Sequence, residues 1–152
     1  MQKHQVINEG DGRCIKKKLL AVDGSVHFER STDHAIQLGK LTTDAEVELI
    51  YVLDYSKSKS EVLHSGSAEA LEQARRLKLK KIEEKFQTEE FPYKLTMRHG
   101  EPGPTIVSYT NDNHFDLVII GSRGLNSFQE MVLGSVSHKV AKRVDCPVLI
   151  VK

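Results

Sequence analysis

The sequence predicts an α/β fold: one doubly wound domain whose mostly parallel sheet has helices on both faces. Short continuous apolar runs, which suit strands covered on both faces, alternate along the chain with longer segments of helical periodicity. Strands that alternate with helices imply βαβ units with right-handed crossovers. The 152 residues fit one domain, and the sequence has no internal repeat or interdomain linker.

The first elements follow a polar lead-in, residues 1–14, which we expect to be a flexible tail. The apolar run at residues 19–22 predicts the first strand. A helix is expected over residues 31–41, because Ser31 or Thr32 can cap its amino end.

A second apolar run predicts a strand over residues 47–53, followed by a polar loop rich in Ser and Lys over residues 55–65. A long helix is expected over residues 67–87, with charges around most of its surface. Its predicted apolar stripe consists of Leu71, Ala74, Ile82 and Phe86.

The third strand is expected where Tyr93, Leu95 and Met97 alternate with polar residues. This period of two indicates a strand with one solvated face, which fits an edge of the sheet. The Gly- and Pro-rich turn over residues 100–104 then starts a helix that ends near Asn113, since proline suits the first turn of a helix.

The last elements are two strands and a helix. An apolar run predicts a strand over residues 116–120, which Gly121 ends. The final helix is expected over residues 135–145, with valines spaced four apart. The last strand is expected over residues 147–151.

Charge and cysteine content restrict the class of protein. The 22 basic and 21 acidic residues nearly balance, which argues against a broad nucleic-acid surface. No apolar run approaches the length of a membrane span or signal peptide, so we expect a protein that is neither membrane-bound nor secreted. Cys14 and Cys146 do not have metal-binding spacing, and we expect both to be reduced thiols in a cytoplasmic protein.

Glycines and hydroxyl residues follow the ends of two predicted strands, where open α/β sheets bind ligands. Gly121 and Gly124 allow the backbone to approach a ligand closely. Gly134 leads back to a helix start, where unpaired amides favour an anion. The pattern therefore predicts a phosphate site.

Polar side chains near these glycines could add contacts. Ser135 and Ser137 can donate hydroxyl hydrogen bonds, and Arg123 could supply positive charge. The carboxylate of Asp23 is better suited to ribose hydroxyls or to a metal on the phosphates. Each has a simpler alternative: Asp23 as a turn cap, Arg123 as a solvated side chain and Ser137 as an ordinary first-turn residue.

The pattern Gly121-x2-Gly124-x9-Gly134-Ser135 resembles the nucleotide motif of ATP-binding universal stress proteins. The first strand with its acidic turn, the turn at residues 100–102 and the last strand also resemble that family. The resemblance covers about residues 17–152, and we expect the domain to span residues 15–152.

The resemblance implies a five-stranded parallel sheet in the order 3-2-1-4-5, with adenine against the end of the second strand. The expected cofactor is ATP, or ADP or AMP, with Mg²⁺ or Mn²⁺ held through the phosphates. The nucleotide-binding residues implied are Asp23, Val52, Gly121, Arg123, Gly124, Gly134, Ser135, Val136 and Ser137.

These observations predict a nucleotide-binding regulatory protein of the stress response. Hydrolysis is expected to be weak or absent, because Asp23 is the sole candidate general base and its expected partner is ribose or metal. The alternatives are a slow ATPase, or a protein-interaction module of the same fold that binds no nucleotide. A Walker P-loop is absent from the sequence.

The last predicted strand also suggests self-association. If residues 148–151 lie at the sheet edge, their apolar side chains and backbone groups have little to protect them, since Lys152 is the one charge beside them. We therefore predict that this strand pairs with a second copy across a twofold axis, and the resemblance implies such dimers too.

Overall fold

The computed structural model describes residues 15–22, 28–54, 66–122 and 133–152. The predicted tail at residues 1–14 and the predicted loop at residues 55–65 lie outside these ranges.

Strands and helices alternate along the described chain, as the sequence predicts. The strands are all parallel and form one five-stranded sheet in the order β3-β2-β1-β4-β5. This confirms the doubly wound fold and its strand order. The elements are β1 (Lys17–Val22), α1 (Phe28–Lys40), β2 (Glu46–Leu53), α3 (Ala68–Thr88), β3 (Lys94–His99), α4 (Pro102–Asp112), β4 (Leu117–Gly121), α5 (Ser135–Arg143) and β5 (Val148–Val151).

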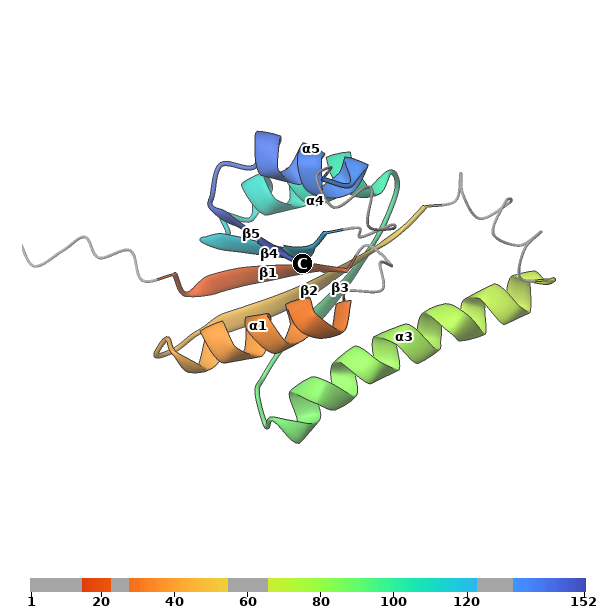
Figure 1. Cartoon of the computed structure of the whole chain (residues 1–152), viewed down its shortest axis with the longest axis horizontal. Coiled ribbons are helices and arrows are strands. Elements are labelled where there is room, and N and C mark those ends of the chain that lie inside the picture. Colours follow the sequence, from red (N-terminus) through yellow and green to blue (C-terminus); the bar gives the residue numbers. More distant parts are fainter. Residues whose placement is uncertain (1–14, 23–27, 55–65, 123–132) are drawn as a thin grey trace, which may run out of the picture.

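The helices form a layer on each face of the sheet, with α1 and α3 on one face and α4 and α5 on the other (Figure 1). The central strand β1 packs against both layers of helices. Leu20 packs in the core under α1 and α3, whereas Leu19 packs in the core under α4 and α5. Because both faces of β1 are buried, its residues 19–22 are continuously apolar rather than alternating.

α1 begins at Phe28, three residues before the predicted start, and the prediction that Ser31 or Thr32 caps it is wrong. Both residues are buried within the helix. Their hydroxyls donate to the Phe28 carbonyl at 3.1 and 2.6 Å, respectively. Serine and threonine can thus bond back to the preceding turn, although their general preference is for the cap position.

α3 packs on the molecule mainly through its carboxyl-terminal half. Ser67 is its N-cap and accepts a hydrogen bond from the Ala70 amide at 3.1 Å. Ile82 and Phe86 are buried, as predicted, but Ala74 is exposed. The predicted stripe fails there because the amino-terminal half of the helix extends beyond the sheet (Figure 1).

β3 lies at an edge of the sheet, as its alternating pattern predicts. The exposure of its side chains differs from the predicted alternation, however. Met97 is 47% exposed, whereas Thr96 is only 8% exposed. Thr96 is buried because its hydroxyl donates to the Glu48 carboxylate beneath α4.

The remaining elements lie close to their predicted positions. α4 has proline in its first turn and ends at Asp112, with Asn113 as its C-cap. α5 ends at Arg143, two residues before the predicted end. β5 forms the other edge of the sheet, which confirms its predicted place. Within the described ranges, no helix has both the length and the apolar character needed to cross a membrane.

Candidate functional site

The candidate site lies at the edge of the sheet where the strands end. The chain runs outward from β1 through β2 to β3 in one direction, and through β4 to β5 in the other. The order therefore reverses between β1 and β4, which is where doubly wound sheets place their ligand crevice. Ala21 of β1 lies opposite Ile50 on β2 and Ile120 on β4, so the three strands end at nearly the same level.

Val52 presents main-chain groups, not its side chain, to this crevice. The amide of Glu46 donates to Lys16 beside β1, while the carbonyl of Leu53 accepts from Gly100 beyond β3. Backbone groups alternate in direction along a strand. Val52 is an even number of residues from Glu46, so its main-chain groups also face β1. Its side chain is buried in the core under α4 and α5.

Gly121 faces the same place from the other side. The amide of Ser122 donates to the Val151 carbonyl of β5 at 2.7 Å. By the same alternation, the preceding Gly121 directs its main-chain groups toward β1. Main-chain groups of Val52 and Gly121 thus converge on the end of β1 from its two neighbours.

The amino end of α5 supplies donors for an anion. Gly134 is its N-cap, with φ −57° and ψ 154°, and it provides no side-chain capping bond. The first intrahelical bond runs from the His138 amide to the Gly134 carbonyl at 2.9 Å. The amides of residues 135–137 consequently have no acceptor within the helix.

The side chains of this first turn have different roles. Ser135 is exposed, and Val136 is buried in the core, so Val136 can offer a ligand only its amide. Ser137 is buried, and its hydroxyl donates to the Gly134 carbonyl at 3.0 Å. In this structure the Ser137 hydroxyl therefore bonds within the first turn of the helix.

Among the described helices, the first turn of α5 is the best suited to an anion. α1 and α3 carry acidic residues in their first turns, Glu29 and Glu69. α4 has prolines at positions 102 and 104, which remove two of its three free amide donors. α5 has no acidic residue in its first turn and no proline there, so its dipole and donors are both available.

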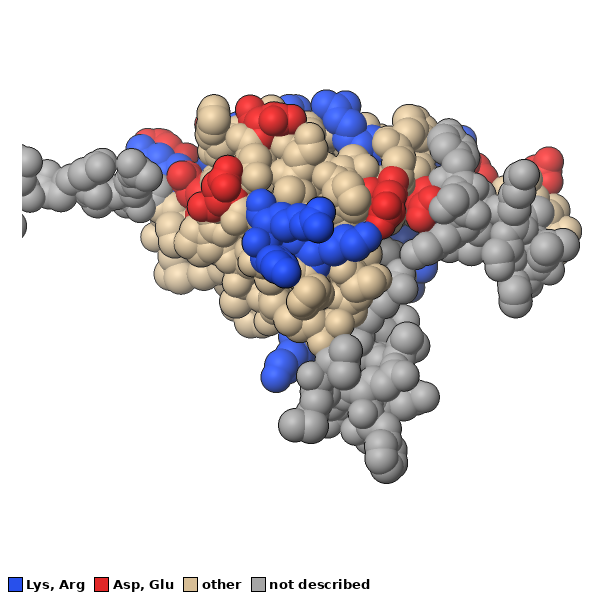
Figure 2. Space-filling model, turned by 90° about the horizontal axis from the view of Figure 1, so that it is seen from above, with Lys and Arg blue, Asp and Glu red and all other residues tan. Residues whose placement is uncertain are grey.

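Lys and Arg side chains also lie on the face covered by α4 and α5, mostly away from the amino end of α5. Figure 2 looks onto the face covered by α4 and α5 and shows Lys and Arg side chains gathered there. α5 carries Lys139, Lys142 and Arg143. Lys139 forms an ion pair with Glu101. The other two lie in the last turn, where they complement the helix dipole.

The structure brings together the main chains of Val52 and Gly121 at the end of β1, and by topology α5 begins at the same edge. The predicted site residues Asp23, Arg123 and Gly124 lie outside the described residues. No group of three His, Cys, Asp or Glu side chains within residues 15–22, 28–54, 66–122 and 133–152 could hold a metal ion.

Cys146 is half-buried at the opposite edge, where the strands begin. Burial is the main factor that raises the pKa of its thiol, and nearby Asp116 and Asp145 raise it further. Cys14 lies outside the described residues.

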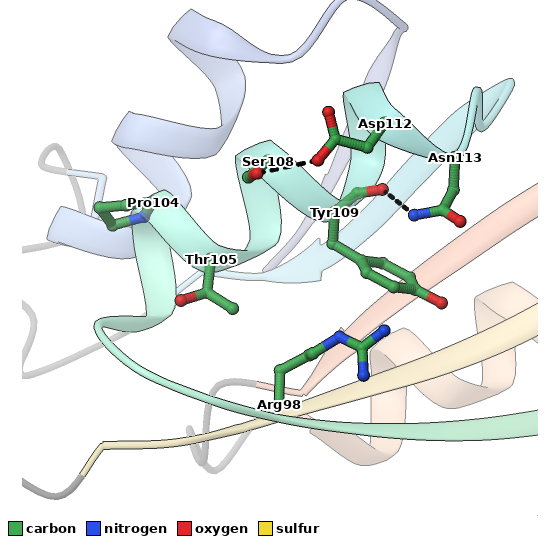
Figure 3. A pocket seen from close by; sticks show the side chains of 7 residues that line it. All are labelled: Arg98, Pro104, Thr105, Ser108, Tyr109, Asp112 and Asn113. Atoms are coloured by element: carbon green, nitrogen blue, oxygen red, sulfur yellow. Dashed lines mark hydrogen bonds between the residues drawn. The ribbon is translucent and has the colours of Figure 1, made fainter.

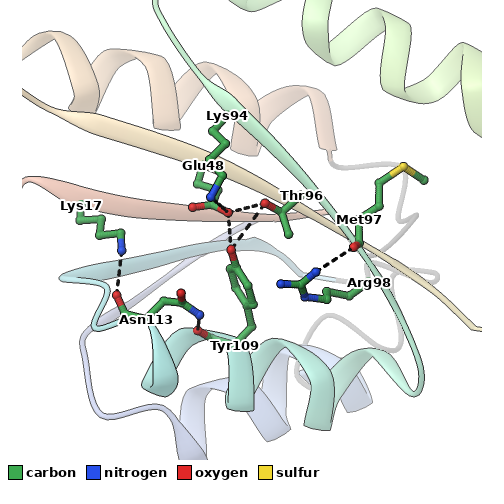
Figure 4. Close-up of polar contacts among 8 residues, drawn as sticks. All are labelled: Lys17, Glu48, Lys94, Thr96, Met97, Arg98, Tyr109 and Asn113. Carbon is green, nitrogen blue, oxygen red and sulfur yellow. Dashed lines mark hydrogen bonds and ion pairs between the residues drawn. The ribbon is translucent and has the colours of Figure 1, made fainter.

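A second polar cluster was not predicted from the sequence. Glu48, in the middle of β2, is buried and accepts hydrogen bonds from the hydroxyls of Thr96 and Tyr109 (Figure 4). Lys94 forms an ion pair with the same carboxylate at 3.3 Å. The guanidinium of Arg98 lies over the Tyr109 ring, 5.0 Å from its centre. The feature of the sequence that could have indicated this cluster is a glutamate inside an otherwise apolar predicted strand.

A cavity of about 460 Å³ lies beside this cluster, between β3 and α4 (Figure 3). Hydroxyl, amide and charged groups line it together with the Tyr109 ring. Its lining residues are Arg98, Pro104, Thr105, Ser108, Tyr109, Asp112 and Asn113.

Comparison with known proteins places the chain in a family. The model of the universal stress protein family matches residues 15–152. Universal stress protein MJ0531 of Methanocaldococcus jannaschii is 33% identical over 98% of this chain and 88% of its own length.

Solved structures agree with this match. The structure of MJ0577, a universal stress protein of the same organism, superposes with a TM-score of 0.72 at 30% identity, covering 91% of this chain and 96% of that one. The Archaeoglobus fulgidus universal stress protein in complex with dAMP shares the fold, with a TM-score of 0.66 at 20% identity over 91% of this chain and 99% of that one. This chain belongs to the universal stress protein family.

Proposed function

We propose that the protein binds an adenine nucleotide, ATP or its products ADP and AMP, across the carboxyl edge of the sheet. One observation carries the proposal: Val52 and Gly121 direct main-chain groups toward the end of β1 from both sides, while the amino end of α5, which has no side-chain cap, has three amides without an acceptor in the helix. Main-chain groups suit the edge of a base, and helix-terminal amides suit phosphate.

Each part of the nucleotide has a proposed partner in the chain. Adenine lies against Val52, and ribose lies near Asp23 and Gly121. The phosphates lie against the chain from Arg123 and Gly124 to the first turn of α5, where Gly134, Ser135, Val136 and Ser137 contribute mainly amides. Mg²⁺ or Mn²⁺ would then be held chiefly through the phosphate oxygens.

Solved relatives support this proposal at the level of ligand chemistry. One solved member of the family holds dAMP. That protein shares only 20% identity with this chain, so its ligand is a guide to chemistry and not to individual contacts. The glycine spacing of this chain itself, from Gly121 to Gly134, is the closer support.

The proposed role is regulation in the cytoplasm, through nucleotide occupancy and dimer contacts. Among the residues proposed to face the nucleotide, Asp23 is the single carboxylate, and ribose or metal would occupy it. We therefore expect little ATP hydrolysis. The alternatives are a slow ATPase and an interaction module that binds no nucleotide.

The substitution Gly134→Asp tests where the phosphates bind. Gly134 has the extended backbone of an N-cap, so aspartate there should cap α5 and preserve its stability. Its carboxylate would also lie where the phosphates bind. Titration calorimetry with ATP, after removal of bound nucleotide, should show at least about tenfold weaker binding, equivalent to about 1.4 kcal/mol.

Gly134→Asn is the matched control, because asparagine caps a helix without adding negative charge. It should retain more of the ATP affinity than Gly134→Asp. Equal affinity of wild type and Gly134→Asp would exclude phosphate from the end of α5. Absence of any binding by the wild type would favour the interaction module.

A further inference from the structure

The outer edge of β3 has main-chain groups that no described strand pairs with. Because the Gly100 amide bonds to Leu53 on β2, the even-numbered residues of β3 direct their main chains toward β2. Leu95 and Met97 therefore direct theirs outward. β3 contains no proline, and its register with β2 is continuous over all six residues. Such an edge can accept a further strand.

The even-numbered side chains of β3 lie on the α4 side of the sheet. Thr96 bonds to Glu48 beneath α4, and Arg98 lies over Tyr109 of α4. Figure 3 shows Arg98 on the β3 wall of the cavity, below the helix. Side chains from one face of an added strand would therefore lie beside Arg98 and at the mouth of this cavity.

Arg98 gives this edge a charge that the described residues do not neutralise. No ion pair among them includes Arg98, and its one hydrogen bond is a long contact, 3.5 Å, with the Met97 carbonyl. Lys94 is 68% exposed despite its ion pair with Glu48. Asp112 lies on the α4 wall, where Ser108 donates to it, and would repel an incoming carboxylate there, so an acidic side chain would pair with Arg98 at the β3 wall.

The same charges disfavour a second copy at this edge. If two β3 strands paired antiparallel about a twofold axis at Thr96, Lys94 of each copy would lie opposite Arg98 of the other. Like charges directly across a strand pair are destabilising. The occupant that complements this edge is instead an extended segment with acidic side chains.

We propose that the outer edge of β3 binds an acidic, extended peptide segment of another protein as an added strand. Main-chain hydrogen bonds form with Leu95 and Met97, and a glutamate or aspartate of the segment pairs with Arg98 at the cavity. Backbone pairing gives affinity in such complexes, and the side-chain pocket gives selectivity. Arg98 lies opposite Val52 in the register, but the outward main-chain groups of Leu95 and Met97 face away from β2, so strand addition can be tested independently of nucleotide binding.

Two synthetic peptides test the proposal with the full-length protein. One is an acetylated, amidated peptide of alternating valine and glutamate, and the other replaces each glutamate with glutamine. In an NMR titration, the glutamate peptide should shift the amide signals of Leu95 and Met97. It should also bind at least about tenfold tighter than the glutamine peptide.

Arg98→Gln should abolish most of this preference for glutamate, whereas Arg76→Gln, on the exposed face of α3, should leave it intact. N-methylation of alternate peptide amides supplies a control that leaves the protein unchanged. Methyl groups on one set of alternate amides should prevent binding, while those on the other set should not, because only one edge of the peptide pairs with β3.

Equal affinity for the two peptides, or equal tolerance of both methylation sets, would overturn the proposal. So would glutamate-peptide shifts confined to other parts of the sheet. A second copy would be the occupant if the free protein formed dimers that Met97→Pro dissociated, since that change removes an outward N–H and leaves the pairing with β2 intact.

Discussion

Glu48 connects three segments that are distant in the sequence. It belongs to β2, and its hydrogen-bonding partners come from β3 and α4. A buried carboxylate is costly unless it is hydrogen-bonded or paired, and here two hydroxyls and the Lys94 ammonium satisfy it. The charge thus helps to fix the edge strand and α4 in relation to the centre of the sheet.

The pKa of Glu48 reflects these contacts. Burial alone would raise it, but the hydrogen bonds from Thr96, Tyr109 and Lys94, together with the positive charge of Lys94, lower it below the ordinary value. A lowered pKa in the folded state means that the ionised form stabilises the fold. This contribution is present above the pKa of the unfolded chain and is lost as the pH falls through the folded pKa.

We expect Glu48→Gln to reduce the free energy of unfolding at neutral pH by about 1–3 kcal/mol, because glutamine disturbs a satisfied buried network. It should also remove part of the loss of stability at acid pH. Urea unfolding at a series of pH values from neutral to below 4 would measure both effects.

Glu84→Gln is the control, since Glu84 is exposed and forms a helix-surface pair with Lys80. Its stability and its acid dependence should stay close to those of the wild type. If Glu48→Gln and Glu84→Gln behaved alike at every pH, Glu48 would not be stabilised as an anion.

At the scale of elements, α3 has two unlike halves. Its carboxyl-terminal half is held by the buried Ile82 and Phe86 and by the pair of Lys85 with Asp33 of α1 at 2.6 Å. Its amino-terminal half is mostly exposed, and Leu77 is 61% exposed. The first turns consequently depend on local interactions, of which the Ser67 cap is the clearest.

We expect Ser67→Ala to loosen the first turns of α3 without weakening the whole molecule. Loss of an N-cap costs about 1 kcal/mol, which should speed hydrogen exchange of the amides after Ala70 roughly fivefold. Global unfolding by urea should change little, because the affected turns bury little surface. Ser67→Asp keeps a capping oxygen and should exchange like the wild type; a large global loss in Ser67→Ala would show that the cap supports the core.

The order of elements was predictable because buried parallel strands are continuous apolar runs, bounded in the sequence by glycine or polar residues. Ser31 and Ala74 were harder to interpret, since cap preference and apolar spacing are local signals that tertiary packing overrides. The Glu48 cluster required knowledge of which strand lies beside which helix. At the candidate site, spacing indicated Gly121 and Gly134, but the direction of the main chain at Val52 followed only from the register.

At the scale of the whole molecule, the sheet ends in two unlike edges. β3 is polar and basic on the face that meets α4, whereas β5 is entirely apolar. Val148, Leu149 and Ile150 remain half-buried in the single chain. An apolar edge of this kind is usually covered. We therefore retain the proposal that β5 pairs with a second copy.

We expect the wild-type protein to sediment as a dimer at tens of micromolar. Ile150→Pro should shift it toward monomer, because the bonds of Pro147 and Val151 to β4 imply that the Ile150 amide faces outward. Circular dichroism would check that the variant is folded. A purely monomeric wild type over that concentration range would exclude the β5 dimer.

Lys18 sets a limit on how far the folded unit can be shortened. The Lys18 side chain is fully buried although it belongs to β1, and its ammonium donates to the carbonyls of Ile15 and Lys16. A chain trimmed to start at Lys17 would lose both acceptors and keep the longer contact with the Thr42 hydroxyl, so the buried ammonium would be less well satisfied. The two residues ahead of β1 are therefore part of the architecture, and the smallest autonomous version of this protein must retain them.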